Sequence, residues 1–240
     1  MNRIKNLIML SAGLAVFSIG SADTKNAAAE PHKGADWTPL FDGMSLEGWR
    51  GYMGANITDA WSVVDGELVL RGGSERDHYV NIITERQFKD FDLRFEWKIE
   101  PGSNSGLMYH VKEGPKMPYL TGPEYQILDN EGFRGSKGQP VTKEEYTGSH
   151  YAIEAPRADV MKPIGEWNSS RILAVGNQVQ YFLNGVLTAE FVMHSPEWDA
   201  QVAAAKFAKW KDFGTTDSGH IALQDHGHGA WFRNIRIKEL

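Results

Sequence analysis

The sequence of 240 residues contains no cysteine. Disulfide bonds are therefore excluded, and a stable fold has to depend on a hydrophobic core, which a chain of this length can build. Basic residues are also in deficit, because 25 Lys and Arg stand against 31 Asp and Glu, for a formal net charge of −6. Without a basic stripe to neutralise phosphates, we expect no nucleic acid partner.

Long apolar runs are missing as well, so no segment offers the roughly 20 apolar residues of a membrane span. A shorter run lies near the N-terminus, where Arg3 and Lys5 precede apolar stretches at 7–10 and 14–19, and small residues follow at 20–22. This order is typical of a secretory signal peptide, although a buried helix is the alternative. We expect a signal peptide at 1–22, a linker at 23–36 and a single domain at 37–240, exported to the periplasm or secreted.

Familiar catalytic motifs are absent too. The sequence has no G-x-S-x-G elbow, no P-loop, no H-E-x-x-H helix and no dinucleotide-binding fingerprint. A serine nucleophile is therefore not expected, and any catalytic group has to come from other polar side chains.

The sequence does contain many short segments that alternate polar and apolar residues. Asp92–Ile99 alternates at every step, which is typical of a half-buried strand. Asp65-Gly66 and Asn184-Gly185 suit tight hairpins, because both positions tolerate positive φ. Strands are expected at 61–64, 67–70, 92–99, 106–111, 124–129, 171–175, 178–183, 186–192, 220–224 and 231–238, and a helical segment at 196–211. The pattern predicts an all-β jelly-roll or sandwich with one short helical insertion.

Strand alternation also predicts which polar side chains share a face. In 124–129 the apolar positions Tyr125 and Ile127 should face the core, which places Glu124 and Gln126 together on the opposite face. The same parity places Gln224 and His226 away from the core. The same alternation predicts that three more side chains face away from the core, namely Arg94, Glu96 and His110.

If these strands are neighbours, their polar groups form one groove. Carboxylate, imidazole and amide groups bind vicinal hydroxyls and supply an acid or a base, so such a groove suits a saccharide. An ordinary solvated face is the alternative, and for Arg94 and Glu96 it is equally favoured, with Arg94 pairing with Glu96 or Glu124. For Glu124, Gln126 and His226 we favour function. The parity argument fails wherever a β-bulge intervenes.

Two further signals accompany this face. Asn104 lies in the loop 102–106, whose Asn and glycines suggest close approach of the backbone to a partner, although a simple turn that connects two strands is the favoured interpretation. The run Asp225-His226-Gly227-His228 could bind a divalent cation such as Ca²⁺, but neighbouring strand residues point to opposite faces, so we favour no metal there. Trp198 and Trp210 are candidate platforms for sugar stacking, with core packing as the favoured use.

Ordered motifs along the chain resemble one known family. They are Leu40-Phe-Asp-Gly43 with Trp49, Asp90–Trp97, Gly102–Gly106, Gly122–Asp129, Gly165–Asn168, Ile221–Gly227 and Trp231–Ile235. From about Trp37 to the C-terminus the chain is similar to the 3-keto-disaccharide hydrolases, long catalogued as a domain of unknown function. The resemblance implies a concanavalin A-like jelly roll, export, and cleavage of glycosides oxidised to a ketone at carbon 3.

The resemblance also carries over Glu124, Gln126, Gln224 and His226 as characteristic polar positions. We therefore predict Glu124 and His226 as catalytic, with either as base or acid, and a saccharide as the partner. The predicted substrate-binding residues are Gln126, Gln224, Arg94, Glu96, His110 and Asn104. Two alternatives stay open: a conventional glycosidase that uses Glu96 and Glu124, and a non-catalytic carbohydrate-binding module. The oligomeric state cannot be predicted.

Overall fold

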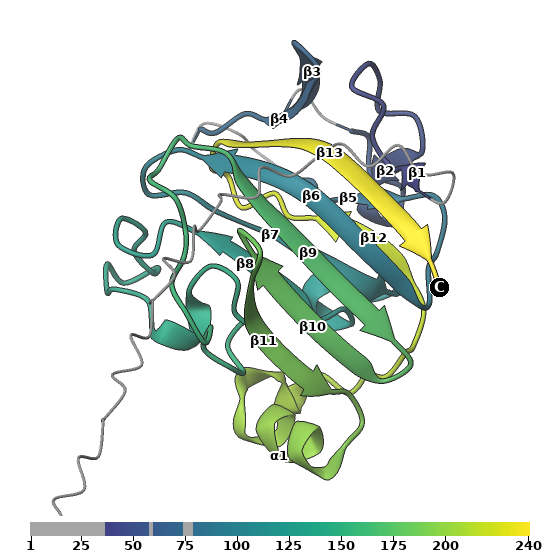
Figure 1. The fold of residues 1–240 in the computed structure, drawn as a ribbon, viewed down its shortest axis with the longest axis vertical. Coiled ribbons are helices and arrows are strands. Elements are labelled where there is room, and N and C mark those ends of the chain that lie inside the picture. The colour runs from purple at the N-terminus through teal and green to yellow at the C-terminus, as the bar shows by residue number, and fades with distance from the viewer. Residues whose placement is uncertain (1–36, 58–59, 74–78) are drawn as a thin grey trace, which may run out of the picture. The chain divides into compact units, whose positions relative to one another are not determined.

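Two antiparallel sheets carry the alternating strands that the sequence predicts (Figure 1). The computed structural model describes residues 37–57, 60–73 and 79–240, so the predicted signal peptide and linker lie outside the described residues. The larger sheet has the order β11-β10-β9-β6-β13-β4-β3, with β1 paired to β13. Its strands are β1 (Thr38–Pro39), β3 (Trp61–Val64), β4 (Glu67–Leu70), β6 (Phe91–Ile99), β9 (Asn168–Val175), β10 (Gln178–Leu183), β11 (Val186–Val192) and β13 (Ala230–Glu239).

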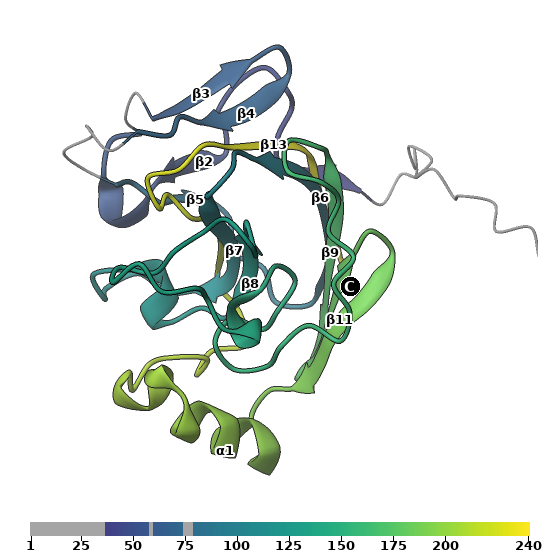
Figure 2. The ribbon, with the colours of Figure 1, turned by 90° about the vertical axis from the view of Figure 1, so that its left-hand side faces the viewer.

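The smaller sheet has the order β2-β5-β12-β7-β8 and packs face to face against the larger one (Figure 2). Its strands are β2 (Trp49–Gly51), β5 (Ile82–Thr84), β7 (Asn104–Val111), β8 (Glu124–Leu128) and β12 (His220–Leu223). The predicted all-β jelly-roll sandwich is therefore confirmed. The very short β1, β2 and β5 were not predicted, because runs of two or three residues show no readable alternation.

The core lies between the two sheets. Leu93, Phe95 and Trp97 of β6 are buried there, as their parity predicts. From the smaller sheet, Tyr125 and Ile127 of β8 enter the same core. The indole N–H of Trp97 donates to the Ser170 hydroxyl at 2.8 Å, and that hydroxyl bonds the Tyr125 hydroxyl at 2.8 Å. This chain satisfies the polar atoms of buried rings and joins the sheets.

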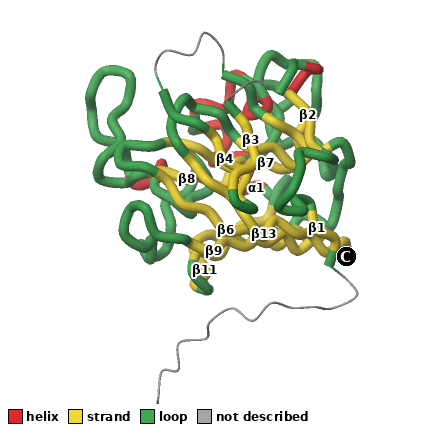
Figure 3. Tube along the Cα trace, turned by 90° about the horizontal axis from the view of Figure 1, so that it is seen from above, coloured by secondary structure: helices red, strands yellow, loops and turns green. Residues whose placement is uncertain are grey.

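The outer face of the smaller sheet is covered in part by loops and short helices, which lie beyond β7 and β8 in Figure 3. They include the 3-10 turns η1 (Tyr52–Gly54), η2 (Pro118–Leu120) and η3 (Lys143–Glu145). A small apolar cluster of Tyr52, Ile83, Met108, Val111 and Ala222 lies under them. This outer face is therefore partly apolar and partly open to the polar groups described below.

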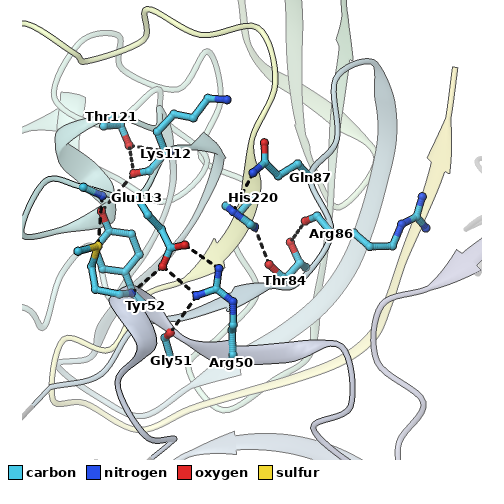
Figure 4. Close-up of polar contacts among 12 residues, drawn as sticks. Arg50, Gly51, Tyr52, Thr84, Arg86, Gln87, Lys112, Glu113, Thr121 and His220 are labelled. Atoms are coloured by element: carbon cyan, nitrogen blue, oxygen red, sulfur yellow. Dashed lines mark hydrogen bonds and ion pairs between the residues drawn. The ribbon is translucent and has the colours of Figure 1, made fainter.

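Next to this cluster, an ion pair fixes β2 to the segment that follows β7 (Figure 4). The Arg50 guanidinium donates to both carboxylate oxygens of Glu113, at 2.8 and 2.6 Å. The Met53 amide donates to the same carboxylate at 2.8 Å. On β12, His220 Nδ1 lies 2.7 Å from the Thr84 carbonyl oxygen, which ties β12 to β5. The strand that leads to Gln224 and His226 is therefore anchored at its start.

The predicted helical segment divides into α1 (Pro196–Ala204) and the 3-10 turn η4 (Lys206–Lys209). Ser195 caps α1 by accepting from the Trp198 amide at 3.1 Å, and Pro196 suits the first turn. At Ala205 the backbone is extended, with φ −90° and ψ 174°, which ends the helix. Within the described ranges, no helix is both long and apolar enough to cross a bilayer.

Stacked aromatic rings dock this insertion onto the sandwich. His150 stacks on Phe191 of β11 at 4.1 Å between ring centroids, and on Trp198 of α1 at 4.9 Å. Trp198 continues to Phe213 at 6.3 Å, and Phe213 stacks on Phe207 of η4 at 4.1 Å. Burial lowers the pKa of His150 to about 3, so this imidazole stays neutral and serves as an aromatic ring. Trp198 is therefore a core residue, as the favoured interpretation held.

Candidate functional site

A pocket of about 310 Å³ opens on the outer face of the smaller sheet. It brings together residues that the sequence places far apart. Its lining consists of Asn104, Tyr119, Glu124, Gln126, Tyr151, Lys206, Phe207, Trp210, Gln224 and His226. The volume lies at the lower end of the range for small-molecule sites, about 300–1,000 Å³.

Strand register explains the floor of this pocket. β7 and β8 pair so that Gly106 faces Gln126 and Met108 faces Glu124. On the other side of β7, the Gln224 amide donates to the Gly106 carbonyl at 2.9 Å. Gln126, Gly106 and Gln224 thus form a row across the sheet, with Glu124 one pair further along β8.

Gly106 leaves the centre of the floor without a side chain. A Cβ atom at this position would overlap Oε1 of Glu124, so the carboxyl group occupies space that any other residue would fill. The backbone φ of Gly106 is not in the left-handed region. The requirement for glycine at position 106 is therefore steric and is imposed by Glu124. The predicted close approach of a partner to this backbone stays a prediction. Residues 104–106 belong to β7, however, and not to a loop.

Glu124 is almost entirely buried, with 4% of its surface exposed. Burial raises the pKa of this carboxyl group to about 8, and the positive charge of Lys206 opposes the change only partly. Among the described residues, its Oε1 has no hydrogen-bond partner. The carboxyl group is therefore a proton carrier near neutral pH, and one oxygen is free to contact a ligand.

Two amide oxygens share this property. Asn104 Oδ1 and Gln224 Oε1 are buried and have no partner within the described part of the chain. Native proteins rarely leave such atoms unpaired, because each costs about 1–3 kcal/mol of desolvation. Unpaired acceptors that line one pocket fit the hydroxyl groups of a saccharide, which donate hydrogen bonds.

His226 lies at the rim of the pocket, just after β12. Its ring contacts Phe133 edge-on at 5.8 Å and stacks on His228 at 5.4 Å. Burial of the ring lowers the pKa of His226, and the neighbouring His228 adds to this effect. The residue as a whole is exposed, so solvent screens part of both effects.

Asp225 shapes the turn that carries His226. Its Oδ2 accepts from the Val80 amide at 2.9 Å, and its Oδ1 accepts from the Gly227 amide at 2.9 Å. The Asp225 amide in turn donates to Asn81 at 3.0 Å. Asp225 is therefore engaged in holding the backbone of this turn.

The predicted residues Arg94, Glu96 and His110 lie elsewhere, and their predicted place on this face is wrong. Arg94 and Glu96 do leave the core side of β6, but β6 belongs to the larger sheet. There Arg94 bonds Asp92 at 3.0 Å, and Arg233 donates to Glu96 at 2.7 Å. Both side chains thus belong to a surface network on the far side of the sandwich.

His110 is displaced by a bulge. The register between β12 and β7 shifts between His220 and Ala222, and His110 has φ 52°. Its ring turns toward Phe91 of the larger sheet at 5.7 Å, and its Nε2 lies 2.8 Å from the Lys89 carbonyl oxygen. The bulge also moves Val111 to the outer face, where it joins the small apolar cluster.

Sequence reasoning missed most of the pocket wall. The rings of Tyr119 and Trp210 form a tilted pair with their centroids 5.5 Å apart. The Lys206 ammonium lies 3.9 Å from the centroid of the Tyr151 ring. These residues come from loops and from the insertion, where no alternation exists to place them. Trp210 is the exception, because its aromatic ring already made it a candidate platform for sugar stacking, and it does line the pocket.

The residues do not form an evident metal centre. Within residues 37–57, 60–73 and 79–240, no group of three or more His, Cys, Asp and Glu side chains could hold an ion. The oxygens of Asn104, Glu124 and Gln224 suit a hard cation as well as hydroxyl groups. The sequence favoured no metal and kept a divalent cation as the alternative, which stays untested.

Comparison with known proteins gives consistent results. The family model described as "3-keto-alpha-glucoside-1,2-lyase-like domain" matches residues 36–238. A 3-keto-disaccharide hydrolase of Bacteroides thetaiotaomicron is 31% identical over 225 residues, which cover 84% of this chain and 77% of the relative. A crystal structure of a candidate glycosyl hydrolase from Parabacteroides distasonis is 34% identical, with a TM-score of 0.79 over 90% of this chain and 99% of that one. A second such structure from the same species is 28% identical, with a TM-score of 0.64 over 85% and 99%.

Proposed function

The chain belongs to the 3-keto-alpha-glucoside-1,2-lyase-like family and is a glycoside-cleaving enzyme, and we propose that its substrates are glycosides with a ketone at carbon 3. The observation that carries this proposal is that Glu124 and His226 line one saccharide-sized pocket, with pKa values moved in opposite directions.

The ketone makes elimination chemically accessible. A carbonyl at carbon 3 acidifies the hydrogen on carbon 2, because the electron pair left behind is delocalised onto the carbonyl oxygen. When a base removes that proton, the enolate expels the oxygen at carbon 1, which takes a proton from an acid. Water then adds across the resulting double bond, with its hydroxyl group at carbon 1 and its proton at carbon 2. The net result is hydrolysis of the glycoside.

The electrostatics favour one assignment of roles. A carboxyl group with a pKa near 8 is largely protonated at pH 7, and an imidazole with a lowered pKa is largely neutral. Glu124 is then ready to protonate the leaving oxygen, and His226 is ready to accept the proton from carbon 2. Asn104, Gln126 and Gln224 orient the sugar through its hydroxyl groups.

A conventional two-carboxylate mechanism has less support. It needs two carboxyl groups about 5–10 Å apart across the scissile bond. Among the described residues that line the pocket, Glu124 is the one that bears a carboxyl group. Glu96, the other carboxylate considered from the sequence, is bound to Arg233 on the larger sheet.

A non-catalytic sugar-binding role also has less support. A binding module gains nothing from a desolvated, unpaired carboxyl group, since neutral amides bind hydroxyl groups without the penalty of burying a charge. The arrangement around Glu124 instead favours proton transfer.

The test is hydrolysis in D₂O. Purified protein should release glucose from a 3-keto-disaccharide and leave the matched unoxidised disaccharide intact. The elimination route installs one deuterium at carbon 2 of the 3-keto product, which NMR detects, whereas direct displacement at carbon 1 installs none. Release of an undeuterated product would refute the elimination step, and cleavage of the unoxidised sugar alone would refute the substrate class. Repeating the assay with a chelator tests the divalent cation.

We also propose that the enzyme acts outside the cytoplasm. The basic start, apolar stretches and small residues of 1–22 support this location. Fractionation of cells that express the chain with and without residues 2–22 tests it. Equal retention of both forms in the cytoplasm would contradict export.

A further inference from the structure

The proposed reaction creates a negative charge that the roles above leave unmatched. Removal of the proton from carbon 2 places the electron pair on the oxygen at carbon 3. Such oxyanions need a fixed positive charge or hydrogen-bond donor in the active site. Arg94, which the sequence predicted to bind the substrate, lies on the larger sheet and bonds Asp92, so it does not reach this oxygen.

Among the described residues that line the pocket, Lys206 is the one Lys or Arg side chain. It is the first residue of η4, directly before the buried Phe207 whose ring ends the aromatic stack. The part of the insertion that carries Lys206 is therefore held against the sandwich independently of any ligand.

The ammonium group itself is held at the wall. Its Nζ lies 3.9 Å from the centroid of the Tyr151 ring, a cation–π contact. Tyr151 is placed beside Glu124, because its amide donates to the Glu124 carbonyl oxygen at 3.2 Å. Although Lys206 is exposed over much of its length, its charge interacts with Glu124 strongly enough to affect the pKa of both groups.

Among the described residues, no ion pair competes for this charge at close range. The ion pairs found between described residues do not include Lys206, so its ammonium is not committed to a carboxylate within 4.0 Å. Burial lowers the pKa of Lys206, while Glu124 opposes this effect, so the ammonium is less solvated than one in free solution. A partly desolvated ammonium interacts more strongly with a developing oxyanion than a hydrated one does.

We propose that Lys206 is a further catalytic residue, whose ammonium group donates to the oxygen at carbon 3 as the enolate forms. This inference rests on the proposed function. Lys206 then lowers the barrier to proton removal, whereas Glu124 acts only on departure of the oxygen at carbon 1. The two residues face different atoms of the same sugar.

The test isolates proton removal from bond cleavage. The 3-keto derivative of 1,5-anhydroglucitol has no leaving group at carbon 1, so in D₂O the enzyme can only exchange the hydrogen on carbon 2, which NMR follows. Lys206→Met should slow this exchange by about 100- to 1,000-fold, the usual effect of losing an oxyanion donor. Lys206→Arg should stay within about tenfold of wild type, because it retains the charge. Lys209→Met, on the same turn but outside the pocket lining, is the matched control and should exchange at the wild-type rate.

Chemical rescue separates charge from shape. Because the sequence has no cysteine, Lys206→Cys introduces a single thiol. Alkylation with 2-bromoethylamine rebuilds a side chain that ends in an ammonium, and alkylation with iodoacetamide adds a neutral amide of similar bulk. The first reagent should restore exchange at least tenfold and the second should not.

The outcomes distinguish the inference from the function on which it rests. If the wild type neither exchanges the analogue nor cleaves a 3-keto-disaccharide, the proposed function fails. If the wild type does both and Lys206→Met exchanges equally fast, only the role of Lys206 is refuted. Equal rescue by both alkylating reagents would also refute it, since shape and not charge would then be responsible.

Discussion

Replacement of Glu124 by glutamine should make the protein more stable, and increasingly so as the pH rises. Glutamine keeps the shape of the side chain but carries no ionisable proton. The pKa of Glu124 is raised from 4.5 to about 8 in the folded protein because the carboxyl group is buried. Each pKa unit corresponds to about 1.36 kcal/mol, so an interval of about 3.5 units amounts to on the order of 5 kcal/mol of unfolding free energy.

The sign follows from proton uptake. Below pH 4.5 the carboxyl group is protonated in both the folded and the unfolded chain, so ionisation adds no penalty. Between pH 4.5 and about 8 the unfolded chain loses this proton while the folded protein keeps it, so wild-type stability falls as the pH rises. Above about 8 the penalty is complete. Glu124→Gln removes it, and its advantage over wild type should grow across this interval.

Urea unfolding of both proteins at pH values from 4 to 9 measures this difference. Any effect of the amide on packing is independent of pH, so the slope isolates the carboxyl group. Glu113→Gln is a control of opposite sign, because the Arg50 ion pair lowers the pKa of Glu113, and that variant should lose stability toward neutral pH. A difference between Glu124→Gln and wild type that does not change with pH would refute the reasoning.

Other consequences can be measured in the same way. His150→Phe should stabilise the protein in acid, because the folded state resists protonation of this imidazole while the unfolded chain takes up a proton below about pH 6.5. Relative to wild type, it should gain about 2–3 kcal/mol on going from pH 7.5 to pH 4.5, and equal urea midpoints at both pH values would contradict the neutral buried ring. Glu124→Gln should lose about 10²- to 10⁴-fold in kcat on a 3-keto-disaccharide but far less on a 3-keto 4-nitrophenyl glucoside, whose leaving group needs no acid. His226→Ala should lose activity on both substrates, and the reverse pattern would exchange the acid and base roles. Gly106→Ala should cost about 1–3 kcal/mol by overpacking, because its Cβ meets Glu124 Oε1. In the Glu124→Ala background this cost should shrink, and a thermal double-mutant cycle that shows no coupling would count against the contact.

Strand alternation predicts the face of a side chain but not the sheet to which the strand belongs. The alternation in β8 correctly placed Glu124 and Gln126 on one face, and that of β12 placed Gln224 beside them. The equally regular β6 pairs with β9 and β13, so its outward residues Arg94 and Glu96 lie on the far side of the sandwich. Sheet membership depends on pairing between strands distant in sequence, which a local pattern does not contain.

Local irregularity and docking account for the other differences. A single bulged residue, His110, reverses the alternation at the end of β7. No turn-forming residue next to it in the sequence predicts this bulge. Tyr151 and Lys206 reach the pocket because ring stacking positions the segments that carry them. Such contacts between distant residues leave no periodic signal in the sequence.

The stack of rings from Phe191 to Phe207 has a consequence for the energetics of substrate capture. A wall that is anchored in this way is ordered when the chain folds and not at each encounter with a sugar. A mobile flap would lose conformational entropy in every catalytic cycle, whereas this wall loses it once, when the protein folds. The binding free energy of the sugar remains available for aligning carbon 2 and the leaving oxygen with the groups that transfer protons.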